Sequence, residues 1–395
     1  RRVLFRSYSR LLRFVLPCIG TMLFTSIYGI VDGLCVSNFV GKTAFAAVNL
    51  IMPLPMLLGT IGFMLGTGGS AIVGITLGEG DQKKADRYFT LFLLAALVSV
   101  SVLAVLGIVF LRPIAVLLGA KGELLDYAVR YGRILMVSLP TFALQNMFQS
   151  FFVTAEKPHL GFWFTVGAGC TNMVLDVLMV GIWGWGVEGA AIATFISQLV
   201  GGVLPVFYFI DRSNSSRLHL CKTSFYSKVL RDACINGSSE LMTNLSMSLV
   251  NILYNFQLLR LAGENGVAAY GVIMYAAFLF VAVFVGYAVG SAPIVSFHYG
   301  ARNHAEVHNL YRKSLRLIAV VAVTLTLASM FIIPCVARIF VGYDAELLAL
   351  TSRAFRLYAL SFLIMGFNVY ASSFFTALGD GVTSALIRSE EHTSE

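Results

Sequence analysis

Three carboxylates stand in stretches of sequence that are apolar enough to cross a lipid bilayer: Asp32, Asp176 and Glu240. A charged side chain at the centre of a membrane helix costs about 2.5–3.5 kcal/mol on insertion scales, so each acid must do something that offsets this cost. An acid in that setting is a functional hypothesis by default, and separate hydrogen bonding for helix packing is the alternative. The sequence therefore points first to proton or cation binding inside a membrane.

Two of these acids lie at the same depth in the expected topology. Asp32 stands about ten residues before Lys42, at the outer end of its segment, and Asp176 stands about ten residues before the outer loop GWGVEG. Thr194, on the segment that returns inward, follows Val187 by seven residues. At a rise of about 1.5 Å per residue, all three fall roughly 10–15 Å below the outer surface, where they can form one cluster.

A fourth residue completes this cluster. Asn172 precedes Asp176 by four residues and therefore shares its helix face. Two carboxylates, an amide oxygen and a hydroxyl are hard oxygen donors, suited to a proton or a small hard cation such as Na⁺ and not to a soft metal. We expect Asp32, Asn172, Asp176 and Thr194 to bind a coupling cation, H⁺ or Na⁺, and expect no other cofactor.

A second polar feature is the segment ELMTNLSMSLVNILYN, whose polar side chains recur at spacings of three and four and so share one helix face. In a membrane such a face lines water or another helix. We expect a central substrate cavity there, with interhelical hydrogen bonding as the alternative. The residues assigned to this cavity are Tyr28, Glu240, Asn244, Ser248, Asn251 and Asn255. Because Glu240 lies nearer the cytoplasm, it is not expected to share the site of Asp32.

Pro17 falls within the first apolar segment, fifteen residues before Asp32. It removes a backbone hydrogen bond and bends a helix. A hinge at Pro17 would link cation binding to the shape of the helix, whereas a static kink is the more common outcome.

The composition requires a membrane for these segments. Of 395 residues, 58% are hydrophobic and only 12% charged, and the mean hydropathy is +0.82, which is typical of an integral membrane protein. A spanning helix needs about 20 apolar residues. The expected spans are 11–40, 44–77, 88–119, 125–155, 160–186, 187–210, 233–262, 267–299, 314–342 and 347–378.

The net charge of +8 is explained by topology rather than by nucleic acid. Lys and Arg gather in alternate loops, for example at Lys83, Lys84 and Arg87, whereas the intervening loop GWGVEG has none. Such loops face the cytoplasm, and this places the N-terminus there. The six cysteines have no paired spacing and no HExxH pattern occurs, so neither a disulfide framework nor a metal site is expected.

The second half of the chain repeats the first at an offset of about 222 residues: AFAAVNLIM matches GVAAYGVIM, and LGEGD aligns with YGARN. Six spans separate the equivalents, so the halves share one orientation and a pseudo-two-fold axis along the membrane normal. We expect an all-α polytopic membrane protein of two six-helix bundles, the second incomplete. Its parts are a partly non-native tail (1–10), an N-lobe (11–210), a cytoplasmic linker (211–232), a C-lobe of four helices and the start of a fifth (233–387), and a non-native tail (388–395).

Several stretches resemble the multidrug and toxic compound extrusion (MATE) family. They are LPCIGTMLFTSIYGIVDGLCVSNFVG, the IMP of the second span, LGEGDQKKA, TNMVLDVLMV and GVEGAAIATFISQ, and the resemblance covers residues 11–387. It implies that the four cation-site residues named above form the N-lobe site of that family, and that Pro17 is the proline about which its first helix bends. Some members use an acid on the tenth helix instead; SFLIMGFNVYASSFF has Asn368 there, which favours the N-lobe site.

Duplicated bundles are typical of transporters, which bind substrate between the halves. We therefore expect a secondary antiporter that exports amphipathic, often cationic organic compounds in exchange for H⁺ or Na⁺. The alternatives are a lipid-linked oligosaccharide flippase of the same superfamily, which needs cationic residues to hold pyrophosphate, and a non-transporting receptor or scaffold. No nucleophile, base and metal set converges, which argues against an enzyme. Its expected partners are a small organic substrate and the bilayer, and it is expected to be a monomer in a bacterial-type inner membrane.

Overall fold

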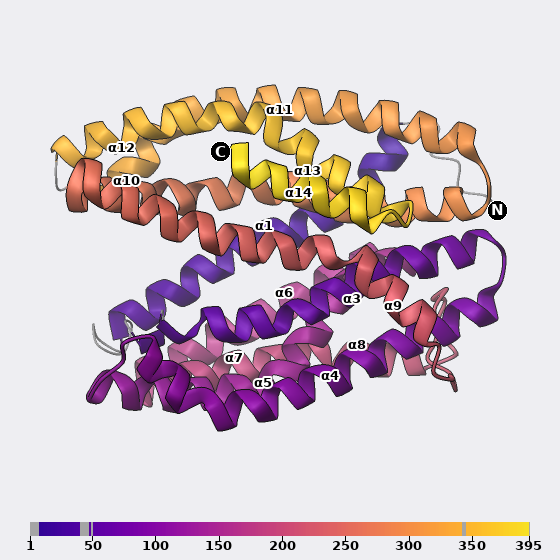
Figure 1. The fold of residues 1–395 in the computed structure, drawn as a ribbon, viewed down its shortest axis with the longest axis horizontal. Coiled ribbons are helices and arrows are strands. Elements are labelled where there is room, and N and C mark those ends of the chain that lie inside the picture. Colours follow the sequence, from indigo (N-terminus) through magenta and orange to yellow (C-terminus); the bar gives the residue numbers. More distant parts are fainter. Residues whose placement is uncertain (1–7, 40–46, 49, 342–344, 395) are drawn as a thin grey trace.

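The computed structural model describes residues 8–39, 47–48, 50–341 and 345–394, and for some residues inside the helices it describes the backbone alone. Every regular element in these ranges is a helix. The helices run side by side along the long axis of the molecule (Figure 1). The first half of the chain forms one layer and the second half the other, and α1 (Tyr8–Phe39) passes between them. This is the two-lobed all-α fold that the repeat predicts.

The helices of the first half follow the predicted spans closely. They are α3 (Pro53–Gly78), α4 (Gln82–Leu117), α5 (Glu123–Thr154), α6 (Pro158–Asp176), η1 (Val177–Ile182), α7 (Gly186–Gly202) and α8 (Leu204–Ile210). The turn between α3 and α4 shows why they end where they do. Gly80 takes a φ of +90°, which favours glycine, and the side chain of Asp81 then caps α4 by accepting the N–H of Lys84 at 3.0 Å.

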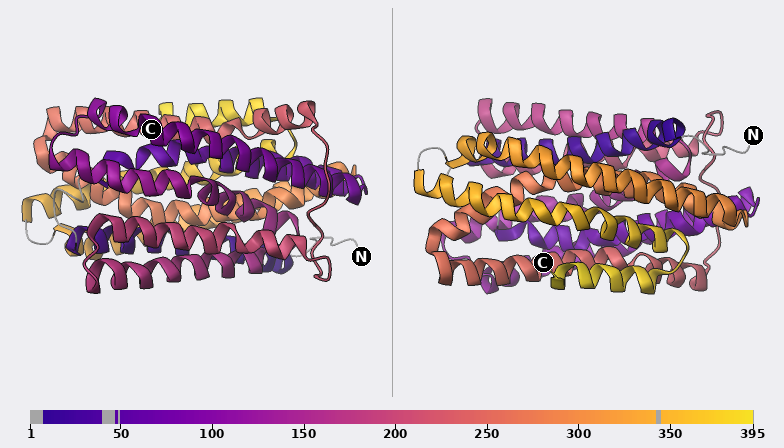
Figure 2. Two further views of the ribbon diagram at one scale, coloured as in Figure 1. Left: turned by 90° about the horizontal axis from the view of Figure 1, so that it is seen from below. Right: turned by 90° about the horizontal axis from the view of Figure 1, so that it is seen from above.

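The second half begins with the short helix α9 and ends with α14. Its elements are α9 (Ser227–Asn236), α10 (Ser238–Gly300), α11 (His304–Val341), α12 (Ala345–Tyr358), η2 (Ala359–Ser361), α13 (Phe362–Ala377) and α14 (Gly381–Ser394). Seen from opposite sides of the bundle, each half covers one face of the molecule (Figure 2).

The element α10 corresponds to two predicted spans and not to one. The rings of Tyr254 and Tyr270 stack with their centroids 5.4 Å apart, whereas sixteen residues of straight helix would separate them by about 24 Å. The chain therefore reverses within α10, as Figure 1 shows. We call residues 238–261 its first arm and 266–300 its second arm. The sequence predicted a loop between these two spans, whereas helical hydrogen bonding continues through the reversal.

Eight helical stretches in the described residues are long and apolar enough to cross a membrane. They coincide with eight of the predicted spans. The other two predicted spans are α5 and the first arm of α10. Helix α5 is less apolar because it lies against α3, α4 and α7 inside its lobe, and a helix surrounded by protein needs fewer lipid-compatible side chains.

The two lobes touch most closely at one end of the bundle. This end carries the linker 211–226, and we call it the linker end. Backbone meets backbone there, because a side chain at Gly68 would strike α9 near Ala233 and one at Gly78 would strike the carbonyl of Phe297 in the second arm. Small residues of this kind let membrane helices approach closely. The linker end is therefore closed.

Candidate transport sites

A cavity of about 630 Å³ lies between the two lobes. Helices α1, α3 and α5 contribute to its wall from the first half, and α10, α12 and α13 contribute from the second. Cavities of 300–1,000 Å³ are the usual size for small-molecule sites. The structure thus provides the chamber between halves that the internal repeat predicts.

The wall of this cavity is mostly apolar, with one acid. Glu240 is the only charged side chain among the described lining residues, and none of those is Lys or Arg. The described lining residues also include four methionines and three tyrosines: Met22, Met247, Met274, Met365, Tyr254, Tyr270 and Tyr358. Methionine adapts to ligands of different shape, and aromatic faces attract organic cations. The cavity therefore suits an amphipathic cation.

The described side chains of the first arm of α10 that line the cavity match the predicted polar face only at Glu240. The lining stripe is Glu240, Thr243, Met247, Val250, Tyr254 and Leu258. Asn244 is not in it, and its amide donates to the carbonyl of Glu240 at 2.9 Å along its own helix. The side chains of Ser248, Asn251 and Asn255 lie outside the described part of the structure. Among the predicted polar residues with described side chains, only Glu240 lines the cavity.

The other acid, Asp176, is fully buried in the first half of the chain, and Asn172 one turn earlier is 2% exposed. Neither lines the central cavity. The amide nitrogen of Asn172 has no hydrogen-bond partner among the described residues, and buried polar groups of this kind mark places for water or a ligand. Asp176 ends α6, and the six residues after it form the π-helix η1. Helices of the π type are rare overall, and those that occur are often found at functional sites.

Helix α7 brings Thr194 to the same level. Gly189 of α7 packs against Met179 of η1, and the two segments run in opposite directions. Five residues further along α7, Thr194 is therefore level with the point midway between Asn172 and Asp176. One turn later on α7, the side-chain oxygen of Gln198 is also buried without a partner in the described structure. Gln198 was not predicted, although its spacing of four from Thr194 is visible in the sequence.

Helix α1 reaches this level from the other side. Gly169 of α6 packs against Phe24 and Tyr28 of α1, and both helices run away from the linker end (Figure 1). One turn beyond Tyr28, position 32 is level with the residues between Asn172 and Asp176. The side chain of Asp32 itself lies outside the described part of the structure. Tyr28, predicted for the central cavity, lies instead at the contact between α1 and α6.

Two predicted residues show ordinary local bonding. The Thr194 hydroxyl donates to the carbonyl of Ala190 at 3.0 Å, which leaves its oxygen able to accept or to coordinate. Helix α1 continues through Pro17, whose carbonyl accepts the hydroxyl of Thr21 at 2.9 Å. A hinge at Pro17 stays a prediction. No group of three or more His, Cys, Asp or Glu that could hold a metal occurs among the described residues.

Comparison with known families decides the class of this molecule. Residues 17–178 and 241–388 match the MatE family model, and the starts of the two stretches agree with the repeat offset of about 222. The chain belongs to the MATE family. MATE proteins are membrane transporters and not enzymes, so this chain is a multi-pass membrane transporter, as the resemblance implied.

Relatives and solved structures support the same assignment. The chain is 20% identical over 377 residues to the multidrug export protein MepA of Staphylococcus saprophyticus. This alignment covers 95% of this chain and 82% of MepA. A crystal structure of MATE in complex with MaL6 superposes with a TM-score of 0.91 at 23% identity, covering 96% of this chain and 85% of that one. The outward-facing conformation of a multidrug resistance MATE transporter of the MOP superfamily superposes at 0.90 and 23%, covering 95% and 84%.

Proposed function

We propose that this MATE transporter exports amphipathic organic cations in exchange for H⁺ or Na⁺. The observation that carries the proposal is the cavity between the lobes, with Glu240 as the only charged side chain among its described lining residues. A carboxylate among methionines and tyrosines attracts a cation that has a large apolar body. The multidrug export proteins that resemble this chain support the same direction of transport.

The second part of the proposal assigns the coupling ion to the N-lobe. Asp176 and Asn172 are buried at one level of α6, and Thr194 of α7 and position 32 of α1 share that level. We propose that the carboxylate of Asp32 joins them there. Asp32, Asn172, Asp176 and Thr194 then offer only oxygen donors, which suit H⁺ or Na⁺.

Exchange follows when the two ligands prefer different states. A ligand that binds both states equally shifts nothing, so the ion must favour one arrangement of the N-lobe and the substrate the other. The π-helix that starts directly after Asp176 gives the ion a local element to act on, because a π-turn and an α-turn differ by one residue of register. Binding at Asp176 would thereby change how η1 and α7 meet.

The direction of export rests on the orientation of the chain. We propose that the N-terminus and the linker end face the cytoplasm of a bacterial-type inner membrane, and that the chain works as a monomer. Lys83, Lys84 and Arg87 lie at the linker end on the first turns of α4, in agreement with the positive-inside rule. The cavity, closed at the linker end, then opens outward.

The flippase of the same superfamily remains the second candidate. A flippase would hold a pyrophosphate between its lobes, and bidentate arginines or lysines are the groups that do so. The described lining residues of this cavity include neither, and they include an acid that would repel the ligand. This observation favours export of cations over lipid-linked sugars.

Transport in proteoliposomes tests the proposal. Efflux of the aromatic cation ethidium is measured under separately imposed H⁺ and Na⁺ gradients, for the wild type, Asp32→Asn and Asp176→Asn. Glu188→Gln is the matched control, because this exposed acid on the first turn of α7 makes a surface ion pair with Arg130. We expect loss of gradient-driven efflux in both aspartate variants and wild-type efflux in the control. Gradient-driven efflux that survives in both aspartate variants would overturn the ion-site assignment.

A further inference from the structure

The linker between the lobes is a folded strap on the first half of the chain. Its backbone N–H groups at His219 and Cys221 donate to Asp86 and Thr90 of α4, at 3.0 and 3.1 Å. Leu218 is fully buried in the aromatic core of that half, and the N–H of Leu220 donates to Phe209 of α8 at 2.8 Å. The linker therefore belongs mechanically to the N-lobe.

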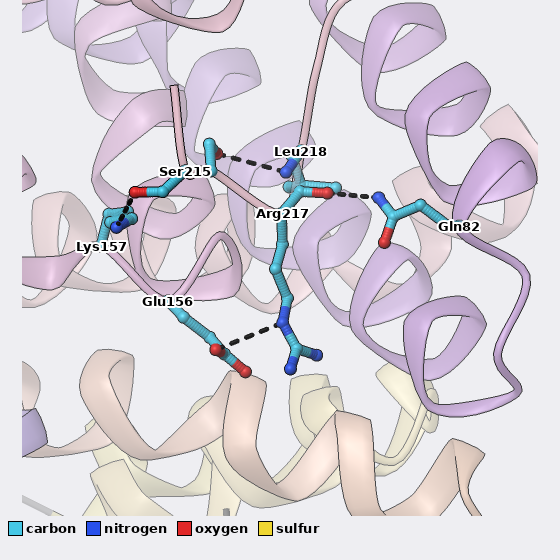
Figure 3. Close-up of polar contacts among 7 residues, drawn as sticks. Gln82, Glu156, Lys157, Ser215, Arg217 and Leu218 are labelled. Carbon is cyan, nitrogen blue, oxygen red and sulfur yellow. Dashed lines mark hydrogen bonds and ion pairs between the residues drawn. The ribbon is translucent and has the colours of Figure 1, made fainter. Parts of the chain in front are cut away.

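Arg217 is the centre of the strap (Figure 3). Its Nε donates to the carboxylate of Glu156, in the turn between α5 and α6, at 3.2 Å. Its carbonyl oxygen accepts the side-chain amide of Gln82, and its neighbour Ser215 accepts a hydrogen bond from Lys157 at 2.8 Å. All of these partners lie in the first half of the chain.

The same guanidinium also reaches the other lobe. It lies over the ring of Phe297, on the second arm of α10, with its central carbon 5.6 Å from the ring centroid. This is the cation–π distance range. Phe297 stands at the closest contact between the lobes, because its carbonyl faces Gly78 and the nearby Gly300 packs against the backbone of Ile75 in α3.

We propose that Arg217 is a latch that holds the linker end closed. Glu156 and the strap fix the guanidinium on the N-lobe, and the Phe297 ring is its mobile partner. When the lobes separate at this end, the strap stays on the N-lobe, and of the Arg217 contacts described above only the one to Phe297 breaks. This inference rests on the alternating access proposed above and assigns Arg217 as a positioning residue, which touches neither substrate nor ion.

The strength of the contact sets the size of the effect. A cation–π pair at a partly exposed site corresponds to about a two- to fivefold change in an equilibrium. The Arg217 and Glu156 side chains are 38% and 41% exposed, so solvent weakens their ion pair. The attraction of Arg217 to the other lobe comes from its cation–π contact with Phe297. Removing the latch should therefore raise the population of the linker-end-open state about two- to fivefold without unfolding the protein.

Electron–electron distance measurement tests this population directly. Spin labels are placed on Lys83→Cys of α4 and His308→Cys of α11, both exposed at the linker end, in a chain whose native cysteines are replaced. The closed and open states give a short and a long distance. We expect Arg217→Gln and Phe297→Leu each to enrich the long distance about two- to fivefold, and the double variant to do no more than either single one.

Lys157→Ala is the matched control, because it breaks a bond that joins the strap at Ser215 to the first half of the chain and leaves Arg217 and Phe297 in place. The latch predicts wild-type distances in this variant. Equal enrichment in Lys157→Ala, or an unchanged distribution in Arg217→Gln, overturns the latch while the proposed function stands. A single distance in the wild type under every ion and substrate condition overturns alternating access, and the latch with it. Melting temperatures recorded on the same samples separate these outcomes from loss of fold.

Discussion

Replacing Asp176 by Asn removes one negative charge from the proposed ion site and changes little else. The amide has nearly the same shape as the carboxylate, and the side chain is fully buried, so no solvent replaces the lost charge. Removing one partner of a buried, hydrogen-bonded charge pair typically costs about 2–5 kcal/mol. At 1.4 kcal/mol per factor of ten, cation affinity should fall about 30- to 4,000-fold.

This loss has a signature in stability as well as in transport. A cation at a concentration of 100 Kd stabilises the folded protein by about 2.7 kcal/mol. If the affinity falls 30-fold, the same concentration stabilises the variant by only about 0.9 kcal/mol. The ion-free variant should be at least as stable as the ion-free wild type, because a neutral amide costs less to bury than a charged carboxylate.

Thermal unfolding in detergent measures both quantities, with Na⁺ titrated at fixed pH and pH varied without Na⁺. We expect the wild type to gain stability with one of these ions and Asp176→Asn to lose most of that gain. Glu188→Gln should behave as the wild type. The reasoning is refuted if Asp176→Asn keeps the full ion-dependent shift, or if it is unfolded before any ion is added.

Three further predictions concern the cavity, the lobe contact and a helix cap. Glu240→Gln should weaken binding of an organic cation about 10- to 150-fold, the value of a hydrogen bond to a charged group, and leave a neutral analogue of the same shape unchanged, as measured by fluorescence titration. Gly68→Ala should cost about 1–3 kcal/mol in thermal unfolding, because its Cβ would meet the backbone of Ala233 and Gly237; Gly29→Ala, inside helix α1 with nothing within 4 Å, should cost no stability. At Asp380, hydrogen bonds from the hydroxyl and N–H of Thr383 lower the pKa below its usual value. Because the pKa is lower in the folded state, ionised Asp380 contributes folding stability above its unfolded-state pKa of about 3.9. This contribution is lost as the pH falls through the folded-state pKa. Hydrogen exchange of α14, corrected for intrinsic rates, should therefore accelerate below about pH 4 in the wild type but not in Asp380→Asn, which caps without titrating.

The helices and the duplication could be predicted because they rest on local signals. Apolar length fixes a membrane span, and the match between AFAAVNLIM and GVAAYGVIM fixes the offset between the halves. The common level of Asn172, Asp176 and Thr194 followed from counting residues along helices, and the packing of Gly189 on Met179 agrees with that count.

Other features depend on neighbours that no local pattern names. On the first arm of α10, Asn244 was expected to line the cavity, whereas its neighbours Thr243 and Met247 line it. Adjacent faces of one helix differ only in which helix they meet, so polarity alone could not choose between them. Nor did the sequence indicate that η1 is a π-helix.

The contacts of the linker between the lobes were not predicted from the sequence either. Its charges were interpreted as topological, whereas Arg217 and Leu218 tie it to the N-lobe. The turn-forming residues in DRSNSS were the available signal, because Asp and Asn side chains bond to the backbone near them. Asp211 does so with Ser213 at 2.9 Å.

Ion movement driven by substrate tests the central claim most directly. Proteoliposomes are loaded with an organic cation and no ion gradient, and H⁺ and Na⁺ fluxes are followed as the cation leaves. The proposed exchange predicts movement of one of the two ions against the direction of substrate in the wild type and in Glu188→Gln, and none in Asp176→Asn. Substrate flux without any ion flux, or coupled ion flux that persists in Asp176→Asn, would contradict it.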